Sequence, residues 1–288
     1  MQSHARAAWD QLQAIYAVHA PQKACNIGPL LAKFAGREAE LVSKVRAKYC
    51  EAASPVAQTS SSHPIRVSWV VLPAECGGGK LGLCFCPGKQ LKKSRLREGH
   101  RDEDGRPIRR SLKKDLARLR APSRGGDCDN DLPQARSQSI GFGCQCLVCL
   151  LNTYELRTIG IRCDYAGAVR EAGMDFISYP IIEGAASSTG GASMDVALAA
   201  REVVDPVVAR LRCGQTVVMH CRGGVGRAGM LAACVLLRVS AASRAKDAVA
   251  LVRQRRCRRA VETSRQNDFV RAYSHWLAAC SDDNDNDN

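Results

Sequence analysis

The pattern of hydrophobic positions divides the chain into a helical first part and a longer part in which strands and helices alternate. Apolar residues recur at helical spacing in residues 5–20 and again in residues 29–53, with Pro21 between the two runs. We therefore predict an N-terminal helical hairpin over residues 1–55 and a Ser-rich linker at 56–63. The pattern leaves open whether the hairpin packs against the rest of the chain or docks another protein.

From residue 64 onward, short apolar runs predict strands and amphipathic runs predict helices. The predicted strands are residues 65–72, 80–86, 144–151, 175–182 and 216–220, and the predicted helices are residues 111–121, 165–172, 192–211, 228–239, 244–255 and 262–279. Because such alternation forms a parallel sheet with helices on its faces, we expect an α/β domain with a central, mostly parallel sheet over residues 64–280. An insertion at about residues 122–141 and an Asp/Asn tail at 281–288 are expected to be disordered.

The strongest chemical signal is the segment T-V-V-M-H-C-R-G-G-V-G-R, in which an apolar strand leads to Cys221 and a helix opens at Arg227. Glycines tolerate unusual backbone angles, so successive N–H groups can turn toward one oxyanion, and the helix N-terminus adds positive charge. The predicted phosphate-binding residues are Arg222, Gly223, Gly224, Val225, Gly226 and Arg227. These charges favour the thiolate of Cys221, and Arg227 offers two parallel donors to phosphoryl oxygens.

The segment predicts that Cys221 attacks phosphorus and forms a phosphocysteine intermediate, with no metal or other cofactor. The alternative is an ordinary glycine-rich turn that contains a buried cysteine. Among the 15 cysteines, only Cys221 is followed six positions later by an arginine, which favours the catalytic interpretation.

H-C-R-G-G-V-G-R-A-G resembles the signature loop of the protein tyrosine and dual-specificity phosphatases, most closely those that act on cyclin-dependent kinases. Four further segments fall in the expected order: L-G-L-C-F-C-P-G at 81–88, Y-P-I-I-E-G at 179–184, A-A-C-V-L-L at 232–237 and S-R-Q-N-D-F at 264–269. The resemblance covers roughly residues 64–280. It implies a protein phosphatase acting on phosphotyrosine, phosphothreonine or phosphoserine, with a phosphothreonine of a cyclin-dependent kinase as the first substrate to test.

The same resemblance implies roles for residues outside the loop. The general acid that protonates the departing oxygen falls on Glu183, where the family has Asp, and Asp175 is the second candidate. His220 is implied to orient the loop and tune the thiol, and Gln266 matches a family glutamine near the catalytic water. Ala228 stands where the family has Ser or Thr. Slower turnover, or a pseudophosphatase that binds phosphorylated partners, therefore remains a second interpretation.

The formal net charge of +14 favours acidic partners such as phosphoproteins, nucleic acid or anionic lipid. Basic runs at residues 89–101 and 106–120 fit a solvated loop and a helix face, or contacts with nucleic acid. Hydrolysis of RNA 5′-triphosphates or phosphoinositides is therefore a third interpretation. Only Arg222 adds charge inside the loop, so we rank it below protein dephosphorylation, for which nucleic acid is not required.

The number of cysteines and the hydropathy of the sequence indicate in which cellular compartment the protein is expected. An odd number of cysteines without regular spacing predicts reduced thiols, as in the cytoplasm or nucleus. No apolar run approaches the roughly 18 residues that a membrane span needs. The two cysteine clusters, at residues 84–86 and 144–149, lie in predicted strands whose side chains alternate between faces, which suits core packing better than zinc binding.

Overall fold

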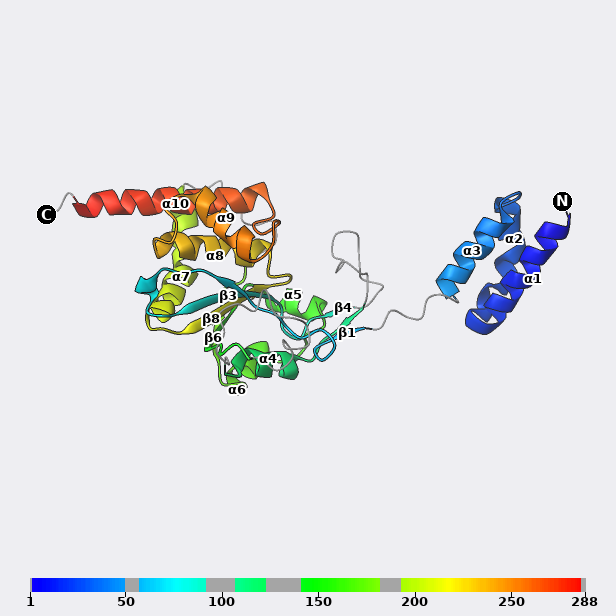
Figure 1. Cartoon of the computed structure of the whole chain (residues 1–288), viewed down its shortest axis with the longest axis horizontal. Helices are drawn as coiled ribbons and strands as arrows, with labels where there is room; N and C mark the ends of the chain where they lie inside the picture. Colours follow the sequence, from blue (N-terminus) through cyan, green and yellow to red (C-terminus); the bar gives the residue numbers. More distant parts are fainter. Residues whose placement is uncertain (1, 50–56, 92–106, 123–140, 182–192, 286–288) are drawn as a thin grey trace. The chain divides into compact units, whose positions relative to one another are not determined.

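The computed structural model describes residues 2–49, 57–91, 107–122, 141–181 and 193–285. The chain forms two compact units, Met1–Ala57 and Gln58–Asn288. Figure 1 shows the first unit as a small group of helices and the second as a sheet with helices on both faces.

Residues 2–49 of the first unit form three α-helices and one 3-10 helix. These are α1 (Gln2–His19), η1 (Pro21–Asn26), α2 (Ile27–Lys33) and α3 (Glu38–Tyr49). The predicted second helix over residues 29–53 is in fact broken between α2 and α3. Gly36 adopts a left-handed φ of 77°, and its N–H donates to the Glu38 carboxylate at 2.8 Å. This turn lets α3 pack along α1, so a three-helix unit replaces the predicted hairpin.

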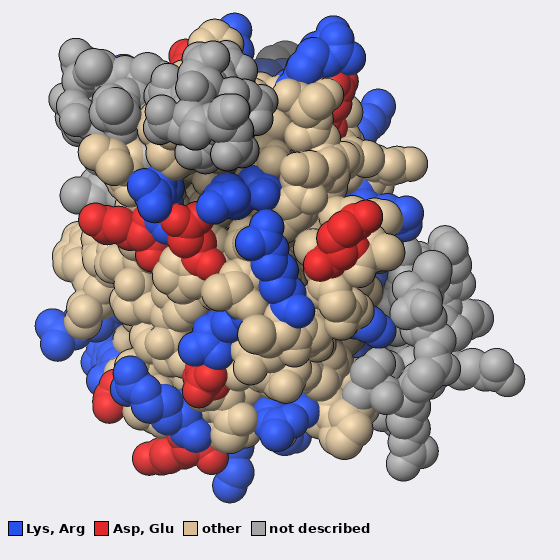
Figure 2. Space-filling view, turned by 90° about the vertical axis from the view of Figure 1, so that its left-hand side faces the viewer, with Lys and Arg blue, Asp and Glu red and all other residues tan. Residues whose placement is uncertain are grey.

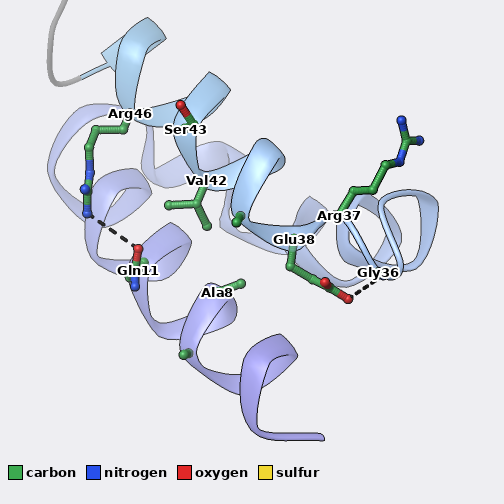
Figure 3. A pocket seen from close by; sticks show the side chains of 10 residues that line it. Ala8, Gln11, Gly36, Arg37, Glu38, Val42, Ser43 and Arg46 are labelled. Carbon is green, nitrogen blue, oxygen red and sulfur yellow. Dashed lines mark hydrogen bonds between the residues drawn. The ribbon is translucent and has the colours of Figure 1, made fainter. Parts of the chain in front are cut away.

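A core of its own holds the first unit together, built around Leu12, Ile27 and Leu41. A cavity of about 690 Å³ lies beside α1 and α3. Figure 3 shows Ala8 and Gln11 of α1 opposite Val42 of α3, with Arg46 reaching Gln11 and the Arg37 side chain pointing away from them.

The second unit is built on a five-stranded sheet in the order β2-β3-β8-β6-β7. The strands are β2 (Ser68–Val70), β3 (Lys80–Phe85), β6 (Cys146–Cys149), β7 (Asp175–Ser178) and β8 (Thr216–Cys221). Only β2 runs antiparallel to its neighbour, and the other four strands are parallel. The predicted α/β fold with a mostly parallel sheet is therefore confirmed.

Helices cover both faces of this sheet. They are α4 (Leu112–Arg120), α5 (Thr153–Thr158), α6 (Tyr165–Glu171), α7 (Ser193–Arg212), α8 (Gly226–Arg238), α9 (Ala245–Arg255) and α10 (Ser264–Asp285), with a short η2 (Ala74–Cys76) before β3. In Figure 1, α8, α9 and α10 lie on one face and α4 and α6 on the other. Helix α8 is the central one, since it packs against α7, α9, α10 and β8 and is buried from Gly226 to Leu237.

Two predicted irregular segments have regular structure. The predicted linker at 56–63 contains β1 (Gln58–Thr59), which pairs with β5 (Ile108–Arg109); β5 in turn pairs with β4 (Gln90–Leu91). A strand of two residues is too short to produce a hydrophobic pattern. At the other end, α10 continues to Asp285 and so includes residues 281–285 of the predicted tail. The predicted insertion lies outside the described residues apart from its first and last positions.

Surface charge and helix hydropathy add two observations. On the face seen in Figure 2, Lys and Arg side chains lie among Asp and Glu side chains, so that face carries mixed charge. None of the described helices combines the length and the apolar character needed to span a bilayer.

A buried ion pair between Arg110, which follows β5, and Asp115 of α4 also contacts the chain near His63 and Gly88. The guanidinium of Arg110 donates to both carboxylate oxygens of Asp115, at 2.9 and 2.8 Å, and to the carbonyl oxygen of His63 at 2.6 Å. Asp115 also accepts the N–H of Gly88 at 2.9 Å. Both side chains are at most 3% exposed, so the loss of either charge would leave the other buried without a counter-ion.

We expect Asp115→Asn to lower the free energy of unfolding by about 3–5 kcal/mol, because it leaves the charge of Arg110 buried without a counter-ion. Urea denaturation of the full chain measures this loss. The control is Asp247→Asn, which breaks the exposed 2.7 Å pair with Arg244 and should cost about 1 kcal/mol or less. Equal losses in the two variants would contradict the structural role of the buried pair.

Candidate active site

The central strand β8 delivers Cys221 to the carboxyl edge of the sheet. Its neighbours fix its position: Cys221 lies in register with Phe85 of β3, and His220 lies in register with Cys149 of β6. Ligands of open α/β folds bind at this edge. The residue Cys221 is 4% exposed. Helix α8 starts at Gly226, five residues after the cysteine, so its positive end faces the same edge.

The loop between β8 and α8 depends on Gly224. This residue has a left-handed φ of 68°, and a Cβ atom there would lie 2.0 Å from the carbonyl oxygen of Cys84. No other residue type fits so close an approach to backbone. The approach turns the N–H of Gly224 toward the cysteine, where it donates to Sγ at 3.2 Å. A thiolate is stabilised by such a donor.

Arg227, the first residue after Gly226 in α8, is held beside the loop by one of its terminal nitrogens. Nη1 lies 2.8 Å from Oε1 of Glu155 and donates to the carbonyl oxygens of Ile181, at 2.6 Å, and Leu150, at 3.4 Å. Within the described residues, every hydrogen bond of Arg227 uses this one nitrogen. Nε and Nη2, which form the other edge of the planar guanidinium, are therefore the atoms that can serve an oxyanion.

Glu155 is a site residue that the sequence reasoning missed. It occupies the third position of α5 and forms a capping box with Asn152: the Asn152 side chain accepts the N–H of Glu155 at 2.8 Å, and Glu155 Oε2 accepts the N–H of Asn152 at 3.2 Å. Its other oxygen pairs with Arg227. The N-x-x-E motif after an apolar strand predicts the start of a helix at the carboxyl edge of the sheet. It does not predict that Glu155 pairs with Arg227.

His220 is fully buried and hydrogen bonds on both ring nitrogens. Nε2 lies 3.0 Å from the hydroxyl of Tyr165, and Nδ1 lies 3.3 Å from the carbonyl oxygen of Cys221. Burial lowers the pKa of His220 to about 4, so the ring is neutral at physiological pH. The sequence placed His220 beside the nucleophile. The structure shows it holding the backbone of Cys221 and reveals Tyr165 as its second partner.

Gln266 lies beside the last glycine of the loop. Its Nε2 would be 2.8 Å from a Cβ on Gly226, and the carboxylate of Glu262 would be 2.7 Å from the same point. Its Oε1 accepts the N–H of Glu262 at 2.8 Å, and its own N–H donates to Thr263. Gln266 thus caps α10 with its side chain while it contacts the loop. Glu262 is a second neighbour that the sequence reasoning did not single out.

The two candidate acids have different outcomes. Asp175 opens β7 in register with Cys146, and its carboxylate pairs with Arg210 at 2.6 Å. It therefore lies at the amino edge of the sheet, and the structure does not bring it to Cys221.

The other candidate acid, Glu183, lies outside the described residues. The chain just before it reaches the site, because the carbonyl oxygen of Ile181 accepts from Arg227.

The cysteines in and next to β3 and β6 are buried and serve packing. Burial raises the pKa of Cys149 to about 12 and of Cys146 to about 11, so these thiols stay protonated. No group of three or more His, Cys, Asp or Glu side chains among the described residues could hold a metal ion. Ala228, the position after the loop arginine, is fully buried and has only a methyl group.

We expect Gly224→Ala to lower the free energy of unfolding by at least about 2 kcal/mol, because the new Cβ meets backbone and the left-handed φ disfavours it. Gly223→Ala is the matched control. A Cβ there would lie 3.9 Å from Val225 Cγ2, an ordinary van der Waals contact, so we expect a change within about 1 kcal/mol. Thermal or urea unfolding measures both variants. A Gly224→Ala chain as stable as the control would show that the loop does not need this close approach.

We expect the burial of His220 to make stability depend on pH. The ring has a pKa of about 6.5 in the unfolded chain and about 4 in the folded one, so the unfolded state binds more protons between these values. This group should remove about 2 kcal/mol of stability between pH 7 and pH 5. Denaturation of wild type and His220→Gln at both pH values measures it. The drop should be smaller in the variant, and equal drops would contradict the assignment.

Comparison with known proteins agrees with this geometry. A family model described as "Swiss Army Knife protein, DSP-PTPase phosphatase domain" matches residues 192–270. Cyclin-dependent kinase inhibitor 3 of Rattus norvegicus is 24% identical over 216 residues, which cover 75% of this chain and 82% of the relative. The Homo sapiens protein of the same name is 23% identical over 216 residues, with the same coverage.

A solved structure shares the fold. The crystal structure of a kinase associated phosphatase, with its catalytic-site cysteine replaced by serine, matches with a TM-score of 0.53 at 22% identity and covers 75% of this chain and 97% of that one. Residues 192–270 thus match a phosphatase domain model, as the signature loop predicts, and the solved structure confirms the expected fold.

Proposed function

We propose that the protein dephosphorylates phosphoproteins through a phosphocysteine intermediate on Cys221. The observation that carries the proposal is the N–H of Gly224 donating to Sγ at 3.2 Å, in a loop that ends at the N-terminus of α8 and at Arg227. A backbone donor and a helix N-terminus favour both the thiolate and a bound phosphate dianion.

The first step forms a bond between Sγ and phosphorus and breaks the ester bond. The electron pair of that bond leaves with the substrate oxygen, which takes a proton from Glu183. In the second step, water attacks phosphorus, the thiolate leaves, and inorganic phosphate is released. Glu183 then takes the proton of the water, which restores its acid form.

Arg227 is proposed to bind the transferred phosphoryl group. Its Nη1 is occupied by Glu155 and by two carbonyl oxygens, so the side chain is fixed before substrate arrives. Nε and Nη2 can donate to two phosphoryl oxygens in one plane, a geometry suited to the trigonal oxygens of the transition state. The loop residues Arg222, Gly223, Gly224, Val225 and Gly226 supply the backbone donors.

Two further residues support the reaction in this proposal. His220 holds the carbonyl oxygen of Cys221, so that the sulfur stays at the open side of the loop. Gln266, against Gly226, is within reach of water that enters the site for the second step. Both are side chains without charge at neutral pH, and neither competes with phosphate for Arg227.

The names of the relatives suggest the substrate class. Proteins called cyclin-dependent kinase inhibitor 3 match three quarters of this chain, so a phosphorylated cyclin-dependent kinase is the first protein substrate to test. The first unit has its own core and an open cavity beside α1 and α3. We propose it as a docking module for another protein.

Ala228 favours one alternative, a pseudophosphatase that binds phosphorylated partners without turnover. A hydroxyl at this position could stabilise the departing thiolate in the second step, and the methyl group of Ala228 cannot. In that case a phosphocysteine would accumulate or substrate would stay bound, and the site would act as a phosphate receptor.

We expect wild type to release phosphate from an aryl phosphate and from phosphopeptides, and Cys221→Ser to abolish release. Glu183→Gln should lower kcat by about 10²–10⁴-fold, the usual contribution of a general acid. The controls are Cys213→Ser and Glu171→Gln, which replace exposed residues. Phosphopeptides, triphosphorylated RNA and inositol phospholipids are compared in the same assay. Preference for RNA or lipid would overturn the substrate class, and binding without turnover would favour the pseudophosphatase.

A further inference from the structure

An arginine outside the signature loop donates hydrogen bonds to the backbone carbonyl groups of the loop. Arg256 follows the last residue of α9. Its Nε donates to the carbonyl oxygen of Gly224 at 2.9 Å, and its Nη2 donates to that of Gly223 at 2.9 Å. Nη1 donates to the hydroxyl of Ser68 at 3.3 Å. The planar guanidinium therefore contacts two consecutive carbonyl groups and the edge strand β2 at once.

These contacts determine where the loop amides point. In a planar trans peptide, the carbonyl of one residue and the N–H of the next residue point in opposite directions. With the carbonyls of Gly223 and Gly224 drawn to Arg256, the N–H groups of Gly224 and Val225 face the other way. The observed bond from the Gly224 N–H to Sγ of Cys221 agrees with this geometry.

No carboxylate in the described part of the chain neutralises the charge of Arg256. Within the described residues, Arg256 makes no ion pair, and its three hydrogen-bond acceptors are neutral oxygens. Its field reaches the end of β3 under the loop: burial raises the pKa of the Cys84 thiol, and Arg256 is the largest influence opposing that rise. A cation without a counter-ion beside the loop favours negative charge on its inner side.

We propose that Arg256 is a positioning residue for the phosphatase reaction, which orients the amides of Gly224 and Val225 toward Cys221 and supplies a second positive charge that favours its thiolate. The inference rests on the proposed function. It divides the work between two arginines: Arg227 contacts the phosphoryl group, and Arg256 acts through the loop backbone without touching substrate.

Two substitutions separate positioning from charge. Arg256→Met removes both, and Arg256→Lys keeps the charge but cannot reach two carbonyls in one plane. The first readout is the rate at which iodoacetamide alkylates Cys221 at pH 6.5, followed by mass spectrometry of the peptide that contains it. The second readout is kcat/KM for an aryl phosphate. Alkylation reports the thiolate directly and does not require turnover.

For Arg256→Met, we expect alkylation of Cys221 to slow about tenfold and kcat/KM to fall about a hundredfold, since a misplacement of about 1 Å can cost that much. Arg256→Lys should recover most of the alkylation rate and little of kcat/KM. Arg120→Met is the matched control, because it removes a 2.9 Å bond from an arginine to the carbonyl oxygen of Gly173 away from the site. It should leave both readouts unchanged.

Thermal unfolding shows which variants are folded. If Arg256→Met does not fold, the comparison of Arg256→Lys with wild type still tests the proposal. If folded Arg256 variants match wild type in alkylation rate and in kcat/KM, the proposal that Arg256 is a positioning residue is wrong, while the proposed phosphatase function stands. If wild type shows no turnover, the proposed function fails, and the alkylation rates still decide whether Arg256 sustains the thiolate.

Discussion

The close packing of Gly224 against the end of β3 is the constraint on which the site depends. The absent Cβ would lie 2.0 Å from the carbonyl oxygen of Cys84, so the loop can cross the strand end only with glycine at this position. That crossing directs the Gly224 N–H to Sγ and leaves the two neighbouring carbonyls facing Arg256. One missing side chain thus sets the direction of the amides, and the amides set where negative charge is stable.

The sequence predicts the parts of the site that are contiguous in the chain. Cys221 and Arg227 are found from a spacing within one strand, turn and helix, and each position has a chemical reason. Glu155 lies 72 residues before its partner Arg227, and Arg256 lies 32 residues after its partner Gly224. No pattern in the segments around Glu155 and Arg256 predicts these contacts. Only the fold, which brings the ends of α5 and α9 to one sheet edge, reveals them.

The same distinction applies to the fold. Long runs in which hydrophobic residues recur at regular spacing predict the helices and the parallel strands. An element that buries one face needs many hydrophobic residues at this spacing. The break at Gly36 and the two-residue strand β1 depend instead on single backbone bonds: the Gly36 N–H to Glu38, and the pairing of Gln58 with Ile108. Such local bonds leave no periodic trace. The structure confirms that Asp175 is the first residue of its strand, and its pairing with Cys146 places it at the amino edge of the sheet, away from Cys221.

The cysteines show how environment, and not residue type, assigns chemistry. Cys149 lies in β6 beside β8, yet its thiol is buried and donates to the carbonyl oxygen of Leu151, and burial raises its pKa to about 12. Cys221 accepts a backbone N–H instead. The contacts differ in direction: a carbonyl acceptor favours a protonated thiol, and an amide donor favours a thiolate. The sulfur of Cys221 accepts this backbone N–H bond, and the proposed nucleophilic role of Cys221 follows from this inward-pointing amide of the β8-to-α8 loop.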